Sequence, residues 1–593
     1  MATSQDLSLR RALGTAVGTG WAGLRDAARH SPGWLAGSAV LFGVQALIPA
    51  AEVWLLRQLV AGLATPAGSR SGDRPAVGLV LAGLTIVVGV NFPLGQIAVS
   101  AAQRMGFRLG LRYSIRLAYA AARMSPSRLA DPQQVTDLEA ADQAVQPMSG
   151  VPGSALQLAG TVITSAGLCV AICMINLPAG LLVLSALLPT VIAFTFIARL
   201  ETARWPAVAA AERGARYAAE QLLQQRPATE LATLGSGPKV ASIVARRRGQ
   251  RMILFDGIIG SDMRWEAAAS LGTAVLLAAA LVTMINSDLK PALAAAAIAG
   301  ILSGLSAVRF TGHAFGLVVS AAPHARSYRS VVDRVCTTDQ AEIVPEVSRL
   351  EAQGLTVSYP GASRPAVTDV SLMARRGEII ALVGINGAGK TTTVNALLGV
   401  VQPSAGRVLI DDHDASQLGE VRRLAHFGLL TQEFGRYEFT VREVITLGTP
   451  VDAVDDHEIW AALEQARAAD LVRALPDQLD TQLGQQWGGV GLSGGQWQRL
   501  ALARVCLRNA GIWVLDEPTS AIDAEAEREI FAELQRTRAD RITIVVSHRA
   551  WTLRGMDRIY VFDQGRIVQT GRYEQLLGER GRFAELFAGQ LED

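Results

Sequence analysis

The chain has 593 residues, of which 50% are hydrophobic and 18% are charged, and its formal net charge is +2. A single hydrophobic core does not normally grow to this size, so two or more domains are expected. The small net charge argues against a nucleic-acid partner. The mean hydropathy of +0.26 favours a mixture of membrane and soluble parts over an ordinary soluble enzyme.

The first 330 residues contain long apolar runs that predict membrane-spanning helices. A helix needs about 20 apolar residues to cross the hydrocarbon core of a bilayer. Six segments meet or nearly meet this length: 34–54, 76–102, 153–176, 179–198, 267–285 and 292–308. We therefore predict a multidomain membrane protein with an all-α, six-helix transmembrane domain at 33–330. The basic, amphipathic segment 1–32 before it has no uninterrupted apolar core, so it is interpreted as a cytoplasmic segment and not as a signal peptide.

Arginine placement predicts the orientation of these spans. Arginines gather in 1–32, in 103–128 and in 199–251, whereas the connections at 65–75, 176–178 and 286–291 contain few or none. Positively charged loops stay in the cytoplasm. Both termini and the C-terminal half are thus predicted to be cytoplasmic, in a multi-pass protein of the cell (plasma) membrane.

The two long cytoplasmic connections, 103–152 and 199–266, are predicted to be helical extensions of the spans. Each contains a segment expected to cross sideways at the tip, 131–144 in the first and 226–237 in the second; solvated amphipathic helices are the alternative. Among charged residues near the spans, Glu52 is the one kept as a cavity candidate. Arg57, Arg309 and His313 lie so close to predicted span ends that an interfacial or cytoplasmic location fits them at least as well.

After a polar, proline-containing linker at 331–349, residues 350–593 alternate short apolar strands with helix-like stretches, which indicates an α/β domain. The segment GINGAGKTT follows a predicted strand, precedes a helix and fits GxxxxGKT, the phosphate-binding loop of P-loop ATPases. Glycines let the backbone approach phosphate oxygens, Lys390 reaches the β and γ phosphates, and Thr391 is a candidate Mg²⁺ ligand. The predicted nucleotide-binding residues of the loop are Gly384, Asn386, Gly387, Ala388, Gly389, Lys390, Thr391 and Thr392.

The segment IWVLDEP at 512–518 is predicted to be a buried strand that ends in two carboxylates. Asp516 is predicted to orient Mg²⁺ through water, and Glu517 to act as the general base that polarises the attacking water. An in-line displacement of the γ phosphate needs both functions.

LSGGQ at 492–496 narrows the class of nucleotide enzyme, because the ATP-binding cassette (ABC) superfamily uses this sequence to close the site of a partner subunit. Ser493 is predicted to cap a helix, with Gly494, Gly495 and Gln496 completing an anion site at its start. The LSGGQ motif, the phosphate loop and the acidic pair occur together in one chain. The whole chain therefore resembles a half-size ABC exporter of the type IV fold. This resemblance implies an ATPase and translocase that uses ATP and Mg²⁺ and works as a dimer, with a second copy of itself or with a different half.

The resemblance also assigns roles to single residues outside these motifs. Tyr359 occupies the position of an aromatic that stacks on adenine, and Gln432 that of a glutamine that senses the metal. His548 matches the histidine that contacts the γ phosphate, and Asp523 matches an aspartate that lines the seam between two cassettes. The catalytic candidates are thus Glu517, His548 and Gln432, and the metal candidates are Thr391, Gln432 and Asp516. The tips at 131–144 and 226–237 correspond to coupling helices that rest on the ATPase.

One departure from the family pattern bears on the cargo. Many drug and lipid exporters carry an acidic segment similar to TEVGERG before LSGGQ, but here 481–491 reads TQLGQQWGGVG, with Trp487 at the glutamate position. This stretch is similar to exporters of modified, lanthionine-containing peptides. No cysteine precedes Cys169, so no N-terminal cysteine peptidase domain is expected.

The leading hypothesis is therefore an ATP-driven exporter of a peptide natural product or another amphipathic compound, acting by alternating access. Its expected partners are a second chain, the lipid bilayer and a small-molecule or peptide cargo, with no nucleic acid. An importer with the exporter fold, as for siderophores, and a lipid or multidrug exporter are alternatives. A DNA-maintenance ATPase is disfavoured, since only about 130 residues separate Lys390 from Glu517.

Overall fold

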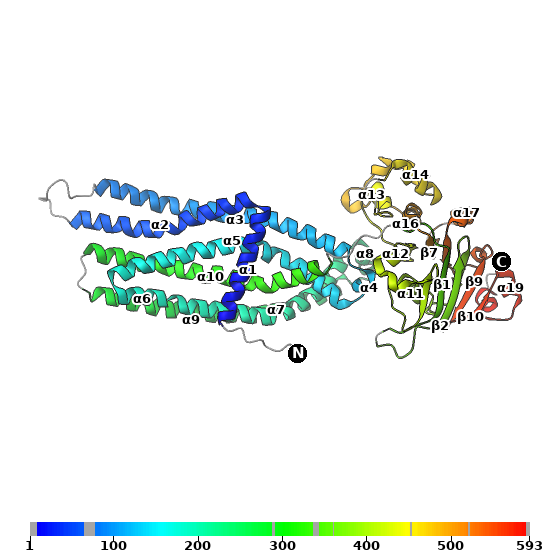
Figure 1. Cartoon of the computed structure of the whole chain (residues 1–593), viewed down its shortest axis with the longest axis horizontal. Helices are drawn as coiled ribbons and strands as arrows, with labels where there is room; N and C mark the ends of the chain where they lie inside the picture. The colour runs from blue at the N-terminus through cyan, green and yellow to red at the C-terminus, as the bar shows by residue number, and fades with distance from the viewer. Residues whose placement is uncertain are drawn as a thin grey trace. The chain divides into compact units, whose positions relative to one another are not determined.

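The computed structural model describes residues 9–64, 77–287, 291–335, 343–359, 361–450, 454–519, 522 and 524–588 (Figure 1). It divides into two compact units. The helical unit comprises Met1–Arg123 and Pro132–Cys336, and the α/β unit comprises Met124–Asp131 and Thr337–Asp593.

The helical unit contains six helical segments that are long and apolar enough to cross a membrane, counted over the described residues. Its helices are α1 (Leu9–His30), α2 (Pro32–Ala64), α3 (Val77–Ala122), α5 (Pro132–Ile175), α6 (Leu177–Ser185), α7 (Leu187–Leu223), α8 (Gln225–Thr233), α9 (Gly237–Ile285) and α10 (Pro291–Val335). One of the six spans, Leu177–Glu201, runs through α6 and the first part of α7. The predicted six-helix membrane domain is confirmed.

Four of these helices are more than twice as long as a span requires. Helices α3, α5, α9 and α10 have 46, 44, 49 and 45 residues, whereas about 20 suffice to cross the bilayer core. They continue as helices beyond their apolar windows, as predicted for the long connections.

The amphipathic N-terminal segment forms helix α1, which packs against other helices of the helical unit. A Cβ at Gly23 would lie 2.8 Å from Val151 of α5, so the two helices are in close contact. The hydroxyl of Tyr113, on α3, donates a hydrogen bond to Asp26 Oδ2 (3.1 Å). Helix α1 therefore contacts α5 closely at its own small residue Gly23, and it accepts a hydrogen bond from α3 at Asp26.

The first sideways tip was wrongly predicted at 131–144. Residues 132–144 belong to the continuous helix α5, and the short helix is α4 (Pro126–Leu129), just before it. Proline is favoured in the first turn of a helix, so Pro126 and Pro132 each begin one, and the short helix lies between them. Within the α/β unit, Ser127 of α4 donates backbone and hydroxyl hydrogen bonds to the Glu420 carboxylate (2.9 and 2.5 Å). The second tip does contain a separate short helix, α8.

The α/β unit has two sheets. The strands are β1 (Arg349–Val357), β2 (Val367–Arg375), β3 (Ile379–Val383), β4 (Ala405–Ile410), β5 (His413–Asp414), β6 (Phe427–Leu430), β7 (Ile512–Asp516), β8 (Ile542–Val546), β9 (Arg558–Asp563) and β10 (Arg566–Gly571). One sheet has the order β10-β9-β3-β8-β7-β6 and the other the order β2-β1-β4-β5. In the larger sheet β3, β6, β7, β8 and β9 pair in parallel.

The helices of this unit, besides α4, are α11 (Lys390–Leu398), α12 (Glu420–Leu424), α13 (Val441–Thr446), α14 (Asp456–Gln465), α15 (Ala469–Arg473), α16 (Gly494–Arg508), α17 (Ala524–Arg536), α18 (Ala550–Leu553), α19 (Tyr573–Gly578) and α20 (Arg582–Phe587). Every residue of β3, β7 and β8 is buried, as expected for parallel strands covered on both faces. Along β3, Ile379 and Ala381 face one hydrophobic core, while Ile380 and Leu382 face the other. Open sheets of this kind bind ligands at the carboxyl ends of their strands.

Candidate nucleotide site

The phosphate loop begins where the buried strand β3 ends, and its backbone requires glycine. Gly384, Gly387 and Gly389 have φ angles of +154°, +81° and +103°, in the region that residues with a Cβ rarely adopt. At Gly384 a Cβ would also lie 2.5 Å from the carbonyl oxygen of Phe562. Of the other loop residues, Ala388 is buried and Asn386 is exposed.

The loop leads into a helix start that is suited to an anion. Helix α11 begins at Lys390, and no side chain caps it. The free N–H groups of a first turn and the positive end of the helix dipole attract phosphate. Lys390 Nζ donates to the carbonyl oxygens of Gly384 (2.7 Å) and Ile385 (3.0 Å), so the loop curls around its ammonium group. Burial lowers the pKa of Lys390, while Asp516 and Glu517 oppose that shift.

The acidic pair stands at the end of the buried strand β7. Asp516 is buried, and its pKa is raised by that burial and then by the neighbouring Glu517, with Lys390 acting in the opposite direction. Glu517 has a φ of +49°, and its N–H donates to the carbonyl of Val546 on β8 (3.0 Å). A non-glycine residue at positive φ is uncommon, and such strain clusters at functional sites.

The Glu517 carboxylate is held from both sides. Gln432 Nε2 donates to Glu517 Oε2 (3.2 Å), and His548 Nδ1 lies 3.0 Å from Glu517 Oε1. Gln432 follows β6 and His548 follows β8, the two parallel neighbours of β7. The sheet therefore brings together three residues that lie far apart in the sequence, and all three had been predicted as site residues.

The oxygen atoms near the acidic pair suit a magnesium ion. Mg²⁺ prefers hard oxygen ligands and is commonly bound by one or two carboxylates together with substrate phosphates. Burial, and then the neighbouring Glu517, raise the pKa of the Asp516 carboxyl, and a divalent cation at this carboxylate would favour its charged form. Thr391 is exposed in the first turn of α11 and contributes a hydroxyl. Over the described residues, no group of three or more His, Cys, Asp or Glu side chains suited to a metal is found.

The LSGGQ segment forms the start of α16. As predicted, Ser493 caps the helix: its Oγ accepts from the Gln496 N–H (3.3 Å), and Gln496 Oε1 accepts from the Ser493 N–H (2.8 Å). The Gln496 side chain is therefore engaged with the cap, while Gly494 and Gly495 begin the helix. Where both segments are described, no hydrogen bond joins 493–496 to the phosphate loop of the same chain.

Tyr359 and Asp523 were also predicted to belong to the nucleotide site. The Tyr359 hydroxyl lies 3.4 Å from Thr392 Oγ1, and its side chain is 40% exposed, so the ring borders the loop and stays accessible. Asp523 lies outside the described residues.

Sequence reasoning missed a buried glutamate that supports the site. Glu527 of α17 is completely buried and accepts hydrogen bonds from Thr519 and from Arg549. Thr519 lies two residues after Glu517, and Arg549 directly follows His548. Glu527 thus connects the two segments that carry the proposed catalytic side chains.

Glu438 is a second residue that sequence reasoning missed, and it contacts the atypical segment at 481–491. Trp487 Nε1 donates to Glu438 Oε2 (3.1 Å), and Gln486 Nε2 bonds to the same oxygen. Trp487 occupies the place of the family's acidic residue, yet it holds a carboxylate from a distant part of the chain. Nothing in the local sequence pairs 438 with 487.

Part of the α/β unit is similar to a known family. Residues 367–520 match the profile described as ABC transporter. The chain is 39% identical over 271 residues to an ATP-dependent lipid A-core flippase of Methylobacillus flagellatus, covering 45% of this chain and 46% of the relative. It is 36% identical over 297 residues to the ABC multidrug transporter MDR2 of Trichophyton interdigitale, covering 48% of this chain and 22% of the relative. The match thus spans less than half the length of each of these relatives.

A solved structure extends the likeness to nearly the whole chain. A bacterial Atm1-family ABC exporter with ATP bound superposes with a TM-score of 0.79, over 94% of this chain and 98% of that one, at 21% identity. At this identity the comparison supports the fold. The predicted fold, a six-helix transmembrane domain of the type IV exporter fold with a C-terminal ABC ATPase domain, is confirmed.

Prediction for the buried glutamate. Glu527→Gln leaves Arg549 without its buried counter-charge, so the free energy of unfolding should fall by about 2 kcal/mol and ATP turnover should drop. The matched control is Glu464→Gln, whose carboxylate pairs with Arg473 at a half-exposed position and should change stability by less than about 1 kcal/mol. Chemical denaturation and ATPase assays of the full chain measure both. Equal effects of the two variants would show that Glu527 has no special role.

Proposed function

We propose that this chain, an ABC half-exporter in its domains and fold, works as an ATP-driven membrane transporter. One observation carries the proposal: in a chain whose described residues contain six candidate spans, the Glu517 carboxylate lies between Gln432 and His548 at the end of β7. A carboxylate that is held in place beside a phosphate loop is what the activation of an attacking water requires.

Each residue of the site has a separate role in ATP hydrolysis. The free N–H groups of the loop and Lys390 bind the β and γ phosphates. Glu517 accepts a proton from water as the water oxygen bonds to the γ phosphorus and the bond to the β–γ bridging oxygen breaks. His548 orients Glu517 and the γ phosphate. Mg²⁺, held by Thr391, Asp516 and Gln432, would neutralise developing charge on the phosphates.

A second chain is part of the proposal. The LSGGQ segment begins a capped helix whose glycines present N–H groups, and within the described residues it makes no hydrogen bond to its own phosphate loop. An anion site of this kind is available to ATP bound by a partner. We favour a homodimer, and a heterodimer with a different half is the alternative.

Export across the plasma membrane, with both termini in the cytoplasm, is the proposed direction. The arginine distribution supports this orientation. An amphipathic cargo is proposed, and the 481–491 segment favours a peptide natural product. Lipid or drug export is the second candidate, because the matched relatives are a lipid A-core flippase and a multidrug transporter.

Prediction for the catalytic base. Glu517→Gln should retain ATP binding and lower kcat for ATP hydrolysis by at least about a hundredfold, because the general base is lost. Glu525→Gln, at an exposed position of α17, is the matched control and should hydrolyse ATP at the unaltered rate. Phosphate release by the purified, membrane-reconstituted chain is the measurement. Hydrolysis by Glu517→Gln at the unaltered rate would exclude Glu517 as the base.

Prediction for transport. Inverted membrane vesicles that contain the chain should accumulate at least one of three labelled probes when ATP is added outside: an apolar cyclic peptide, a lysophospholipid or a lipophilic cationic dye. Vesicles with the Glu517→Gln variant should not. ATP-dependent loss of a preloaded probe would indicate import instead, and no ATP-dependent movement of any probe would contradict the transporter proposal.

A further inference from the structure

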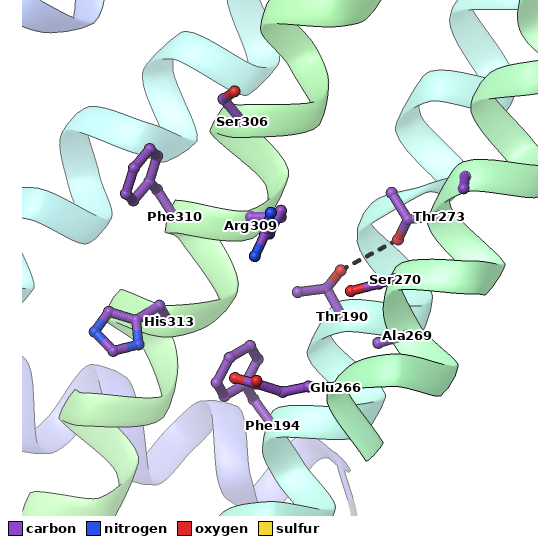
Figure 2. A pocket seen from close by; sticks show the side chains of 11 residues that line it. Thr190, Phe194, Glu266, Ala269, Ser270, Thr273, Ser306, Arg309, Phe310 and His313 are labelled. Carbon is purple, nitrogen blue, oxygen red and sulfur yellow. Dashed lines mark hydrogen bonds between the residues drawn. The ribbon is translucent and has the colours of Figure 1, made fainter. Parts of the chain in front are cut away.

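A cavity of about 600 Å³ lies inside the helical unit, between α7, α9 and α10 (Figure 2). Pockets of roughly 300 to 1,000 Å³ hold drug-sized ligands. The side chains that carry the argument are Thr190 and Phe194 of α7, Glu266 of α9, and Arg309, Phe310 and His313 of α10. Sequence reasoning had considered an interfacial or cytoplasmic location at least as good for Arg309 and His313 as one within the span, and it had not considered Glu266.

The wall of the cavity is firmly packed. A Cβ at Gly312 would lie 2.1 Å from Thr190 and 2.8 Å from Phe194, and one at Gly316 would lie 2.7 Å from Phe194. Helix α10 therefore approaches α7 too closely for any larger residue at these two positions. The Phe194 ring also meets the His313 ring edge-on, with centroids 6.5 Å apart at 74°. The close contact fixes the aromatic wall in place.

The cavity lies near one end of the membrane-spanning stretch. Nineteen residues separate Glu266 from the end of α9 at Ile285, and eighteen separate Arg309 from the start of α10 at Pro291. At 1.5 Å per residue these are rises of about 28 and 27 Å, close to the roughly 30 Å thickness of the hydrocarbon core. In the proposed orientation the cavity is therefore level with the inner leaflet.

The cavity is lined by a negatively charged side chain, Glu266, and a positively charged one, Arg309, and the two do not form an ion pair. Figure 2 shows Glu266 and Arg309 extending from different helices toward the same opening. No ion pair joins Glu266 to Arg309 or His313, all three of which the structure describes. The hydrogen bond drawn among the lining residues joins the Thr190 and Thr273 hydroxyls (3.5 Å). Ionisable groups at membrane depth are costly and usually pair or meet a ligand.

We propose that this cavity binds a small amphipathic zwitterion, such as a short apolar peptide with free ends. Its ammonium group pairs with Glu266, its carboxylate pairs with Arg309, and an apolar side chain packs on Phe194 and Phe310. A ligand with one sign of charge leaves the opposite wall charge unpaired, which favours a ligand with both. This inference deepens the proposed transport function by assigning a class of cargo.

The test uses four forms of the tripeptide Leu-Phe-Leu with the same apolar side chains: free ends, N-acetylated, C-amidated, and blocked at both ends. Binding to the full, nucleotide-free chain in detergent is measured by equilibrium dialysis of tritiated peptide, with protein-free micelles as the blank. Each blocked end should weaken binding at least about tenfold, as expected for the loss of a charge-assisted contact.

Variants then assign the two ends. Glu266→Gln should abolish the effect of N-acetylation only, and Arg309→Gln that of C-amidation only. Glu266→Asp keeps the charge and should keep the preference for a free amino end, which separates a charge effect from a folding defect. The exposed residues Glu230 and Arg216 provide matched controls, since Glu230→Gln and Arg216→Gln should bind all four peptides as the unaltered chain does.

Equal binding of the four peptides, absence of binding, or uniform weakening of all four by Glu266→Gln and Arg309→Gln would overturn the assignment. Because no nucleotide is present, this result is independent of ATP hydrolysis. Failure of the vesicle assay with intact peptide selectivity would instead count against the proposed transport function.

Discussion

The parallel register of three neighbouring strands is the constraint on which the nucleotide site depends. Strand β7 pairs with β6 on one side and β8 on the other, and all three run in the same direction. The residues after their carboxyl ends must therefore meet at one edge of the sheet. This places Gln432 and His548 on either side of Glu517. The positive φ of Glu517 then turns the chain immediately after the buried strand, so that the carboxylate lies between the other two side chains.

Local motifs made part of this site predictable from the sequence. The glycine-rich loop could be recognised from its spacing between a predicted strand and a predicted helix. The acidic pair could be recognised from its position at the end of an apolar strand. Glu527 was not predicted because α17 contains four glutamates, and sequence spacing does not say which one is buried. The contact of Trp487 with Glu438 was equally hidden, since it joins residues 49 positions apart across an irregular segment. Both depend on tertiary packing, which local patterns do not encode.

In the helical unit, hydropathy predicted how many spans there are but not which side chains share a face. Twenty apolar residues are needed whatever their neighbours, so the six spans were predicted correctly. The charges on α9 and α10 share a cavity because Gly312 and Gly316 let α10 approach α7 closely, and this proximity is not visible in one helix alone. The misplaced first tip has a different cause: Pro126 and Pro132 both begin helices, and only one of the two helices is short.

The central claim is that ATP is enclosed by two chains, the phosphate loop of one and the LSGGQ segment of the other. It is tested most directly by cross-linking Asn386→Cys to Ser493→Cys in a Glu517→Gln chain whose native cysteines are replaced by alanine. The account predicts a covalent dimer that forms with Mg²⁺ and ATP and not with ADP. A cross-link confined to single chains, or a dimer yield that does not respond to ATP, would contradict it.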